Sequence, residues 1–420
     1  MIRVLAFAVL LAAHDAKGDE GALAPPLTLD ALVREALDRN PDVRIAQRMV
    51  EAKRARIGQA GALPDPILMY GVMNEGTPVP FQTLGRNGFS EIYLGLSQDI
   101  PYPGKRRLRA EAAHGEAATE KWAAEAVRRR VTADVSRSYY DLYAIHAGLD
   151  VVEESRQLLE DLSRVANARF AVGHASQQDV LEVEVEVSRL SERQARLEEQ
   201  RGIQEARLLR LVFRDARKGV GRPAEVSPTP LTAALEDLLG RAESESPFVH
   251  GRERALAQGE KSLELAQRDR RPDFGVNVVY HNRGGLDPYY TIGGTLTLPG
   301  LHGRQRKAIE ESAANLGAAR SGLDAARAEV RLAVTEAYRS ARRAERLLQL
   351  YDQGILKQDR LSLDSALAQY QVGRVDFLTL ITSWRRLLED QLMFRQELAE
   401  HEKALASLSL HVTVNRQAEN

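Results

Sequence analysis

The chain has 420 residues with 58 basic and 59 acidic side chains, so its net charge gives no indication of nucleic-acid binding. The absence of cysteine excludes disulfides, cysteine-based zinc sites, a thiol nucleophile and a lipid attached through cysteine. The nine histidines never pair at the i, i+4 spacing of zinc ligands, and no Walker A, GxSxG or GxGxxG motif occurs. The sequence therefore predicts no metal site, no cofactor and no enzyme activity.

The N-terminus has the pattern of a secretory signal peptide, assigned to residues 1–21 without a clear cleavage site. Arg3 precedes an apolar run over residues 4–13. A disordered N-terminus is the alternative interpretation. Two short helices follow over residues 28–38 and 42–60, and they are separated at Asn40-Pro41 because the residue before proline avoids the α conformation.

Two segments after these helices change from helical to alternating periodicity. Residues 66–74 are apolar with mixed facing, whereas residues 91–100 place Ile92, Leu94 and Leu96 on one face. Both are predicted to be β-strands. Each is close to the ~9–11 residues with which a tilted strand crosses a bilayer.

A helical hairpin is predicted over residues 105–213, because residues 104–222 contain no proline and are rich in strong helix formers. The hairpin turns at Gly173, since glycine has no Cβ to clash in a left-handed helix cap. The first helix, residues 105–172, would be roughly 100 Å long. A ~100-residue domain has a radius of gyration of only ~13 Å, so this helix requires an elongated bundle. Residues 183–187 alternate like a strand, but their position inside this run favours a helix.

The same order of segments recurs, which divides the chain into a first repeat (22–222), a second repeat (223–414) and a disordered tail (415–420). Gly173 and Gly373 are 373 − 173 = 200 residues apart, and Tyr139 and Tyr338 are 338 − 139 = 199 apart. The second repeat is predicted to contain short helices (231–244 and 247–270), strands (274–282 and 289–298), and a helical hairpin (303–411) that turns at 373.

Four strands cannot close a barrel, since the smallest bacterial barrels have ~8, and an open sheet edge cannot exist in lipid. Transmembrane strands would therefore require several chains to share one barrel. Periodicity alone allows a small soluble antiparallel sheet equally well. The long helices behind a signal peptide favour the shared barrel.

Over residues 27–410 this layout resembles the TolC-like outer-membrane efflux protein family, in the branch that serves heavy-metal and drug pumps. The resemblance depends on the duplication, the strand-to-helix junctions and four short motifs, which are RFAVG at 169–173 with Asp179, YQVG at 370–373, LPDP at 63–66, and SQDIPYPGK at 97–105.

The resemblance implies an α+β membrane protein in the outer membrane of a Gram-negative bacterium. Four transmembrane strands per chain would contribute to a 12-stranded β-barrel shared by a homotrimer and surrounded by outer-membrane lipid. The duplicated coiled-coil helices would form an α-barrel across the periplasm. The implied function is passive export of drugs or metal ions, with a periplasmic adaptor and an inner-membrane pump of the RND type as partners.

The resemblance also implies that the two hairpin turns dock the adaptor and form a gate. The docking residues would be Val172, Gly173, His174, Val372 and Gly373. Tyr370 matches the family's gate tyrosine, three residues before the second glycine.

The family's other gate positions are altered in this chain. Its acidic positions are Thr379 and Thr382, and its basic position is Val375. Arg374, one residue earlier, is the candidate basic residue of the gate. Asp376 and Asp179 are the candidate substitutes, because each carboxylate would appear three times around the trimer axis. The alternative is that both aspartates only stabilise helix N-termini.

A soluble periplasmic coiled-coil scaffold or adaptor is the competing function. The facing of the strands distinguishes the two, because a membrane channel needs one apolar and one polar face on every strand. Residues 67–74 meet this requirement poorly, and the other three strands meet it well.

Overall fold

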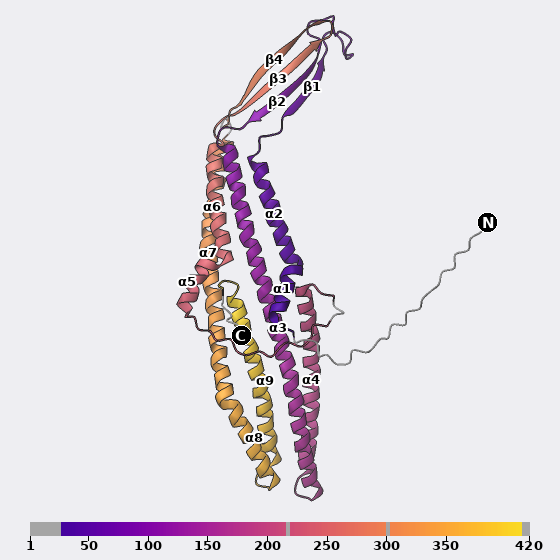
Figure 1. The fold of residues 1–420 in the computed structure, drawn as a ribbon, viewed down its shortest axis with the longest axis vertical. Coiled ribbons are helices and arrows are strands. Elements are labelled where there is room, and N and C mark those ends of the chain that lie inside the picture. The colour runs from indigo at the N-terminus through magenta and orange to yellow at the C-terminus, as the bar shows by residue number, and fades with distance from the viewer. Residues whose placement is uncertain (1–26, 216–218, 300–302, 414–420) are drawn as a thin grey trace, which may run out of the picture.

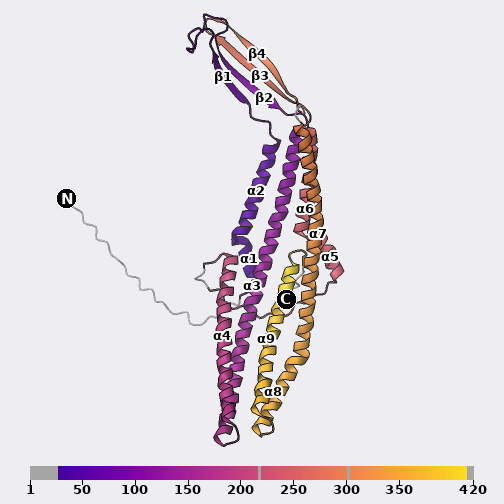
Figure 2. The same cartoon turned by 180° about the vertical axis from the view of Figure 1, so that it is seen from behind.

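The computed structural model describes residues 27–215, 219–299 and 303–413, and in these ranges the chain is a long rod (Figure 1). A β-sheet lies at one end, two helical turns lie at the other, and the same arrangement is seen from behind in Figure 2. This architecture confirms the predicted fold class of long duplicated helices with four strands. The predicted signal peptide and C-terminal tail lie outside the described residues.

The first repeat begins with two short helices and continues through two strands into the longest helix of the described chain. Its elements are α1 (Leu29–Arg39), α2 (Pro41–Gly61), β1 (Ile67–Met73), β2 (Glu91–Ile100), α3 (Lys105–Ala171) and α4 (Gln177–Val212). The Asn40 side chain caps α2 by accepting a hydrogen bond from the Asp42 backbone N–H at 2.8 Å, and Pro41 takes the first helical position. With 67 residues, α3 is roughly 100 Å long.

The second repeat has the same order but differs from the prediction in three places, the first being that its first short helix begins at Leu235 instead of residue 231. Its elements are α5 (Leu235–Glu245), α6 (Pro247–Arg268), β3 (Asp273–Arg283), β4 (Leu286–Thr297), α7 (Arg304–Leu350), the π-helix η1 (Tyr351–Ile355), α8 (Leu356–Gln371) and α9 (Phe377–Leu408). The long helix predicted to continue to the second turn is interrupted by η1. The β3–β4 loop is shorter than predicted, because Gly284, at φ +72°, makes a tight turn directly after Arg283.

The four strands form one antiparallel sheet in the order β1-β2-β3-β4, so the β2–β3 pair joins the two repeats. The register places every second residue on the same face. One face is apolar and exposed, with Leu68, Tyr70, Ile92, Leu94, Leu96, Phe274, Val276, Val278, Tyr290, Ile292 and Leu296. The other face carries small and polar residues on β2 to β4, including Ser97, Asp99, Asn277, Thr295 and Thr297. On β1 this second face is apolar too, with Ile67, Met69 and Met73.

The helices pack around α3, which contacts α2 and α6 towards the sheet and α4 and α9 towards the turns. The largest buried cluster lies near the turns and joins α3, α4, α8 and α9 through residues such as Leu162, Leu190, Leu363 and Trp384. The Trp384 indole N–H donates to the Ser155 carbonyl at 3.3 Å, which fixes α9 against α3. In the described part of the chain, no helix combines the length and the apolar composition that crossing a membrane requires.

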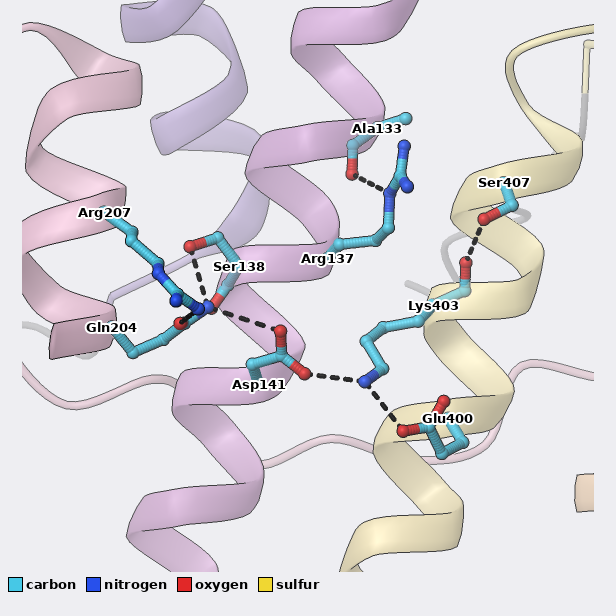
Figure 3. A network of polar contacts seen from close by, with 9 residues as sticks. All are labelled: Ala133, Arg137, Ser138, Asp141, Gln204, Arg207, Glu400, Lys403 and Ser407. Carbon is cyan, nitrogen blue, oxygen red and sulfur yellow. Dashed lines mark hydrogen bonds and ion pairs between the residues drawn. The ribbon is translucent and has the colours of Figure 1, made fainter. Parts of the chain in front are cut away.

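A polar network joins α3, α4 and α9 halfway along the rod (Figure 3). The Lys403 ammonium donates to Asp141 Oδ1 at 2.7 Å and to Glu400 Oε1 at 2.8 Å. Gln204 Nε2 donates to Ser138 Oγ at 3.0 Å and to Asp141 Oδ2 at 3.3 Å. Asp141 therefore connects the first hairpin to α9 of the second. Burial opposes the charge of Lys403, but its hydrogen bonds to Asp141 and Glu400 raise the pKa of Lys403 above its usual value.

Replacing Lys403 with methionine is expected to lower the free energy of unfolding by about 1 kcal/mol, because Asp141 loses its cation. The pKa of Lys403 is higher in the folded chain than in the unfolded chain, where it is about 10.5. The charged lysine therefore stabilises the fold fully below this unfolded value, and the stabilisation is lost as the pH rises through the folded pKa. The difference between wild type and variant should therefore be constant near neutral pH, should begin to fall above about pH 10.5 and should vanish once the pH exceeds the raised folded pKa. Urea unfolding followed by circular dichroism measures it, with the exposed Lys357→Met as control. An equal loss in both variants would contradict a role for the network.

Candidate site at the helical tips

The two helical turns have the same backbone conformation. Gly173 and Gly373 have φ values of +74° and +76°, which residues with a Cβ rarely adopt. The His174 N–H donates to the Arg169 carbonyl at 2.8 Å, and the Arg374 N–H donates to the Gln369 carbonyl at 2.9 Å. These bonds close both turns in the same way and satisfy carbonyls that the helix ends leave free.

The α3–α4 turn and the α8–α9 turn, which contain the predicted docking residues, lie at the end of the rod opposite the sheet (Figure 1). Val172 and Val372, the residues before the two glycines, are 66% and 68% exposed. His174 is exposed as well. Two exposed valines on neighbouring turns are an apolar surface that another protein could cover.

The structure brings together two of the four predicted gate residues, Tyr370 of the second hairpin and Asp179 of the first. The Tyr370 side chain is only 2% exposed, and its hydroxyl donates to Asp179 Oδ2 at 3.2 Å. Burial and the neighbouring Asp179 carboxylate raise the pKa of Tyr370 to about 12. The hydroxyl therefore stays protonated at neutral pH and remains a donor to Asp179.

Arg169 also joins the two hairpins, although sequence reasoning placed it only in the turn motif. Its guanidinium lies 4.7 Å from the centre of the Tyr370 ring, a cation–π geometry. It donates to the Tyr370 carbonyl, and its Nη2 donates to the His174 carbonyl at 3.0 Å. Its position four residues before Gly173 was visible in the sequence, but its contact with a residue 201 positions away was not.

The other two predicted gate residues have separate surroundings. Asp376 is exposed and caps α9, accepting hydrogen bonds from the Thr379 N–H at 2.9 Å and the Thr379 hydroxyl at 2.6 Å. These hydrogen bonds lower the pKa of Asp376. The Arg374 side chain is exposed and makes no ion pair with any residue that the structure describes. The geometry thus assigns Asp376 a capping position, whereas Asp179 contacts the buried tyrosine.

A second ionic link lies further from the turns, where Arg385 of α9 bonds to Glu182 and Glu186 of α4. The Arg385–Glu186 distance is 2.7 Å, and Glu186 is buried. Glu186 belongs to the alternating stretch 183–187, which α4 includes as predicted. Within the described ranges, no group of three or more histidine, aspartate or glutamate side chains is arranged to hold a metal ion.

Comparisons with known proteins agree with this architecture. Residues 32–212 match the family model described as outer membrane efflux protein. A search of the curated proteins finds no match.

Solved structures of similar fold cover nearly the whole chain. A membrane protein from Pseudomonas aeruginosa has 20% identity and a TM-score of 0.78, with 91% of this chain and 93% of that chain covered. The outer membrane protein VceC from Vibrio cholerae has 17% identity and a TM-score of 0.75, with 91% and 96% covered. The CmeC outer membrane channel of Campylobacter jejuni has 17% identity and a TM-score of 0.70, with 91% and 85% covered. The first repeat therefore resembles the outer membrane efflux protein family, and the chain has the fold of solved outer-membrane channels.

Proposed function

We propose that three copies of this chain form a passive export duct for drugs or metal ions, the outer-membrane part of a tripartite efflux system. The observation that carries the proposal is the sheet. It has one exposed apolar face, and the outer edges of β1 and β4 have no strand partner within the described residues. Unpaired backbone N–H and C=O groups are too costly in lipid, so a membrane-embedded sheet must close. Three copies of four strands would supply a 12-stranded barrel.

The helices support the same proposal because they are continuous with the sheet. Lys105, at the start of α3, is buried, and its ammonium lies 2.9 Å from Asp273 Oδ1 at the start of β3. It also donates to the Arg271 carbonyl at 2.8 Å. This junction joins the two repeats at the base of the sheet, so the barrel and the helical rod would form one continuous duct. Inward-facing small and polar residues on β2 to β4 fit an aqueous interior.

The partners follow from the opposite end of the rod. The turns around Gly173 and Gly373 are proposed to dock a periplasmic adaptor, and an inner-membrane pump of the RND type is proposed to drive export. The link between Tyr370 and Asp179 is proposed to narrow the duct at this end. Such a duct transmits the cargo that the pump selects.

Reconstitution and fractionation test this function. The detergent-extracted chain is expected to have the mass of a trimer, to be recovered with outer membranes and to form conducting pores in planar bilayers. Recovery as a detergent-independent monomer in the soluble periplasmic extract would reject the duct and would favour a soluble scaffold or adaptor instead.

A further inference from the structure

The second hairpin contains a discontinuity that the first hairpin lacks. The π-helix η1 lies between α7 and α8, whereas α3 continues to its turn without interruption. From Tyr139 to Gly173 there are 173 − 139 = 34 residues, and from Tyr338 to Gly373 there are 373 − 338 = 35. A π-helix is the way in which an α-helix accommodates an extra residue, and such insertions often occur at functional sites. It also gives the helix a defined place to bend.

A pair of carboxyl groups lies just beyond this discontinuity, between α8 and α9. Asp359 on α8 is only 6% exposed, and among the described residues its buried Oδ2 has no hydrogen-bond partner. Asp390 on α9 is half-buried and is within hydrogen-bonding reach of the Asp359 side chain. Two ionised carboxylates can only accept hydrogen bonds, so a bond between them requires a proton on one of them. Such a proton would give the buried Asp359 Oδ2 the hydrogen bond that it otherwise lacks.

The charged and titratable groups near the carboxyl pair include both cations and acids. Arg386, on α9, is the cation that faces Asp390, and it is exposed. Tyr351 of η1 interacts electrostatically with both Asp390 and Glu397 of α9, and the Glu397 carboxylate lies 3.4 Å from the Arg343 guanidinium of α7. Burial and the hydrogen bond to Asp359 raise the pKa of Asp390 to about 6. The pair therefore changes its charge within the pH range that a periplasmic protein can meet.

We propose that Asp359 and Asp390 share one proton that fastens α8 to α9 in acid, and that losing this proton lets α8 move away from α9 by bending at the π-helix. Because α8 ends at the turn that carries Tyr370, this movement would loosen the proposed gate. Only that consequence depends on the proposed function. The shared proton and the pH-dependent packing of α8 are properties of the fold.

The direction of the pH effect follows from the sign of the shift. The folded pKa of Asp390 lies above its usual value of 3.8, so the folded chain binds more protons than the unfolded chain between these two values. The packing of α8 is therefore strongest below about pH 4 and is weakened as the pH rises to about 6, with little further change above that.

Hydrogen–deuterium exchange of the full-length protein in detergent measures this packing directly. Protection of the α8 amides is expected to fall severalfold from pH 5 to pH 7.5 after correction for intrinsic exchange. The full pKa shift would give about tenfold in this window, and the partial exposure of Asp390 reduces it. Residues 156–171 of α3, which correspond to α8 in the first repeat, are the internal reference. Asp390→Asn, which carries a permanent donor, should keep α8 protected at both pH values. Asp364 is an exposed acid on α8, so Asp364→Asn should behave as wild type.

Asp359→Asn provides the second variant, since it places the donor on the other member of the pair. Loss of the pH dependence in either amide variant, with Asp364→Asn unchanged, would support the shared proton even if no channel activity were found. Protection of α8 that is equal at both pH values in wild type would overturn the proposal, and so would a pH dependence that persists in the amide variants.

Discussion

Replacing Tyr370 with alanine is expected to give the largest increase in single-channel conductance of any change at the tips. The variant removes the ring that Arg169 covers and the hydroxyl that donates to Asp179, so both contacts of the Tyr370 side chain with the first hairpin are lost, while the bond from Arg169 to the backbone carbonyl of residue 370 can remain. A hydrogen bond to a charged group contributes ~1.5–3 kcal/mol. Its loss corresponds to a change of about 10- to 100-fold in the equilibrium between closed and open tips.

Tyr370→Phe is the matched control for this experiment. It keeps the ring, with its edge contact to Phe377 and its position beneath Arg169, and removes only the hydroxyl. Its conductance is expected to lie between those of the wild type and Tyr370→Ala. Planar-bilayer recordings at neutral pH measure the three proteins, and identical conductance in all of them would remove Tyr370 from the constriction.

The same recordings should distinguish the effects of Asp179 and Asp376 on the conductance. Asp179→Asn removes the negative charge from the side chain that accepts the hydrogen bond of the Tyr370 hydroxyl. The hydrogen bond is expected to weaken, and the conductance should rise. Asp376→Asn should change it little, because asparagine caps a helix about as well as aspartate, and the hydrogen bonds of the Asp376 side chain go to Thr379 of the same helix. An effect of Asp376→Asn as large as that of Asp179→Asn would restore the ring of two aspartates that the sequence suggested.

The fold could be predicted from the sequence because the same order of segments occurs twice and because helices and strands have different hydrophobic periodicities. The proline-free runs, the glycines 200 residues apart and the alternating strands each have a local physical cause. The π-helix was not predicted, because no residue type marks it. The extra residue between Tyr338 and Gly373 was visible, but a one-residue difference between repeats can be absorbed in many ways. The tight turn at Gly284 was missed for a similar reason, since the polar residues around it are also typical of a longer loop.

The candidate site was only partly accessible, because its contacts join residues about 200 positions apart. Tyr370 and Asp179 were named from the family pattern, and their hydrogen bond required the two turns to lie side by side. Arg169 was overlooked because, in the sequence, its charge has no nearby partner that indicates a role. Asp376 lies three residues after Gly373, whereas Asp179 lies six after Gly173, so Asp376 corresponds to Ser176, the N-cap of α4. Its hydrogen bonds accordingly remain within its own helix terminus.

Tryptophan at either turn glycine is expected to abolish export while leaving the trimer intact. The Cβ of residue 173 would point into open space, so a large side chain there would stand over the proposed adaptor-docking surface without disturbing the core. At residue 373 the new Cβ would lie 3.3 Å from Arg169 Nη2, so this variant tests the link between the hairpins as well.

Asparagine at the same positions separates backbone strain from obstruction, because it tolerates the left-handed conformation better than other residues with a side chain. Gly173→Asn should therefore retain export, whereas Gly173→Trp should lose it, and both should assemble as trimers on native gels. Export by cells carrying each variant, measured as survival in the presence of a pumped compound, decides the matter. Full export by both tryptophan variants would mean that the adaptor does not dock at the turns, and it would move the docking surface to the sides of the helices.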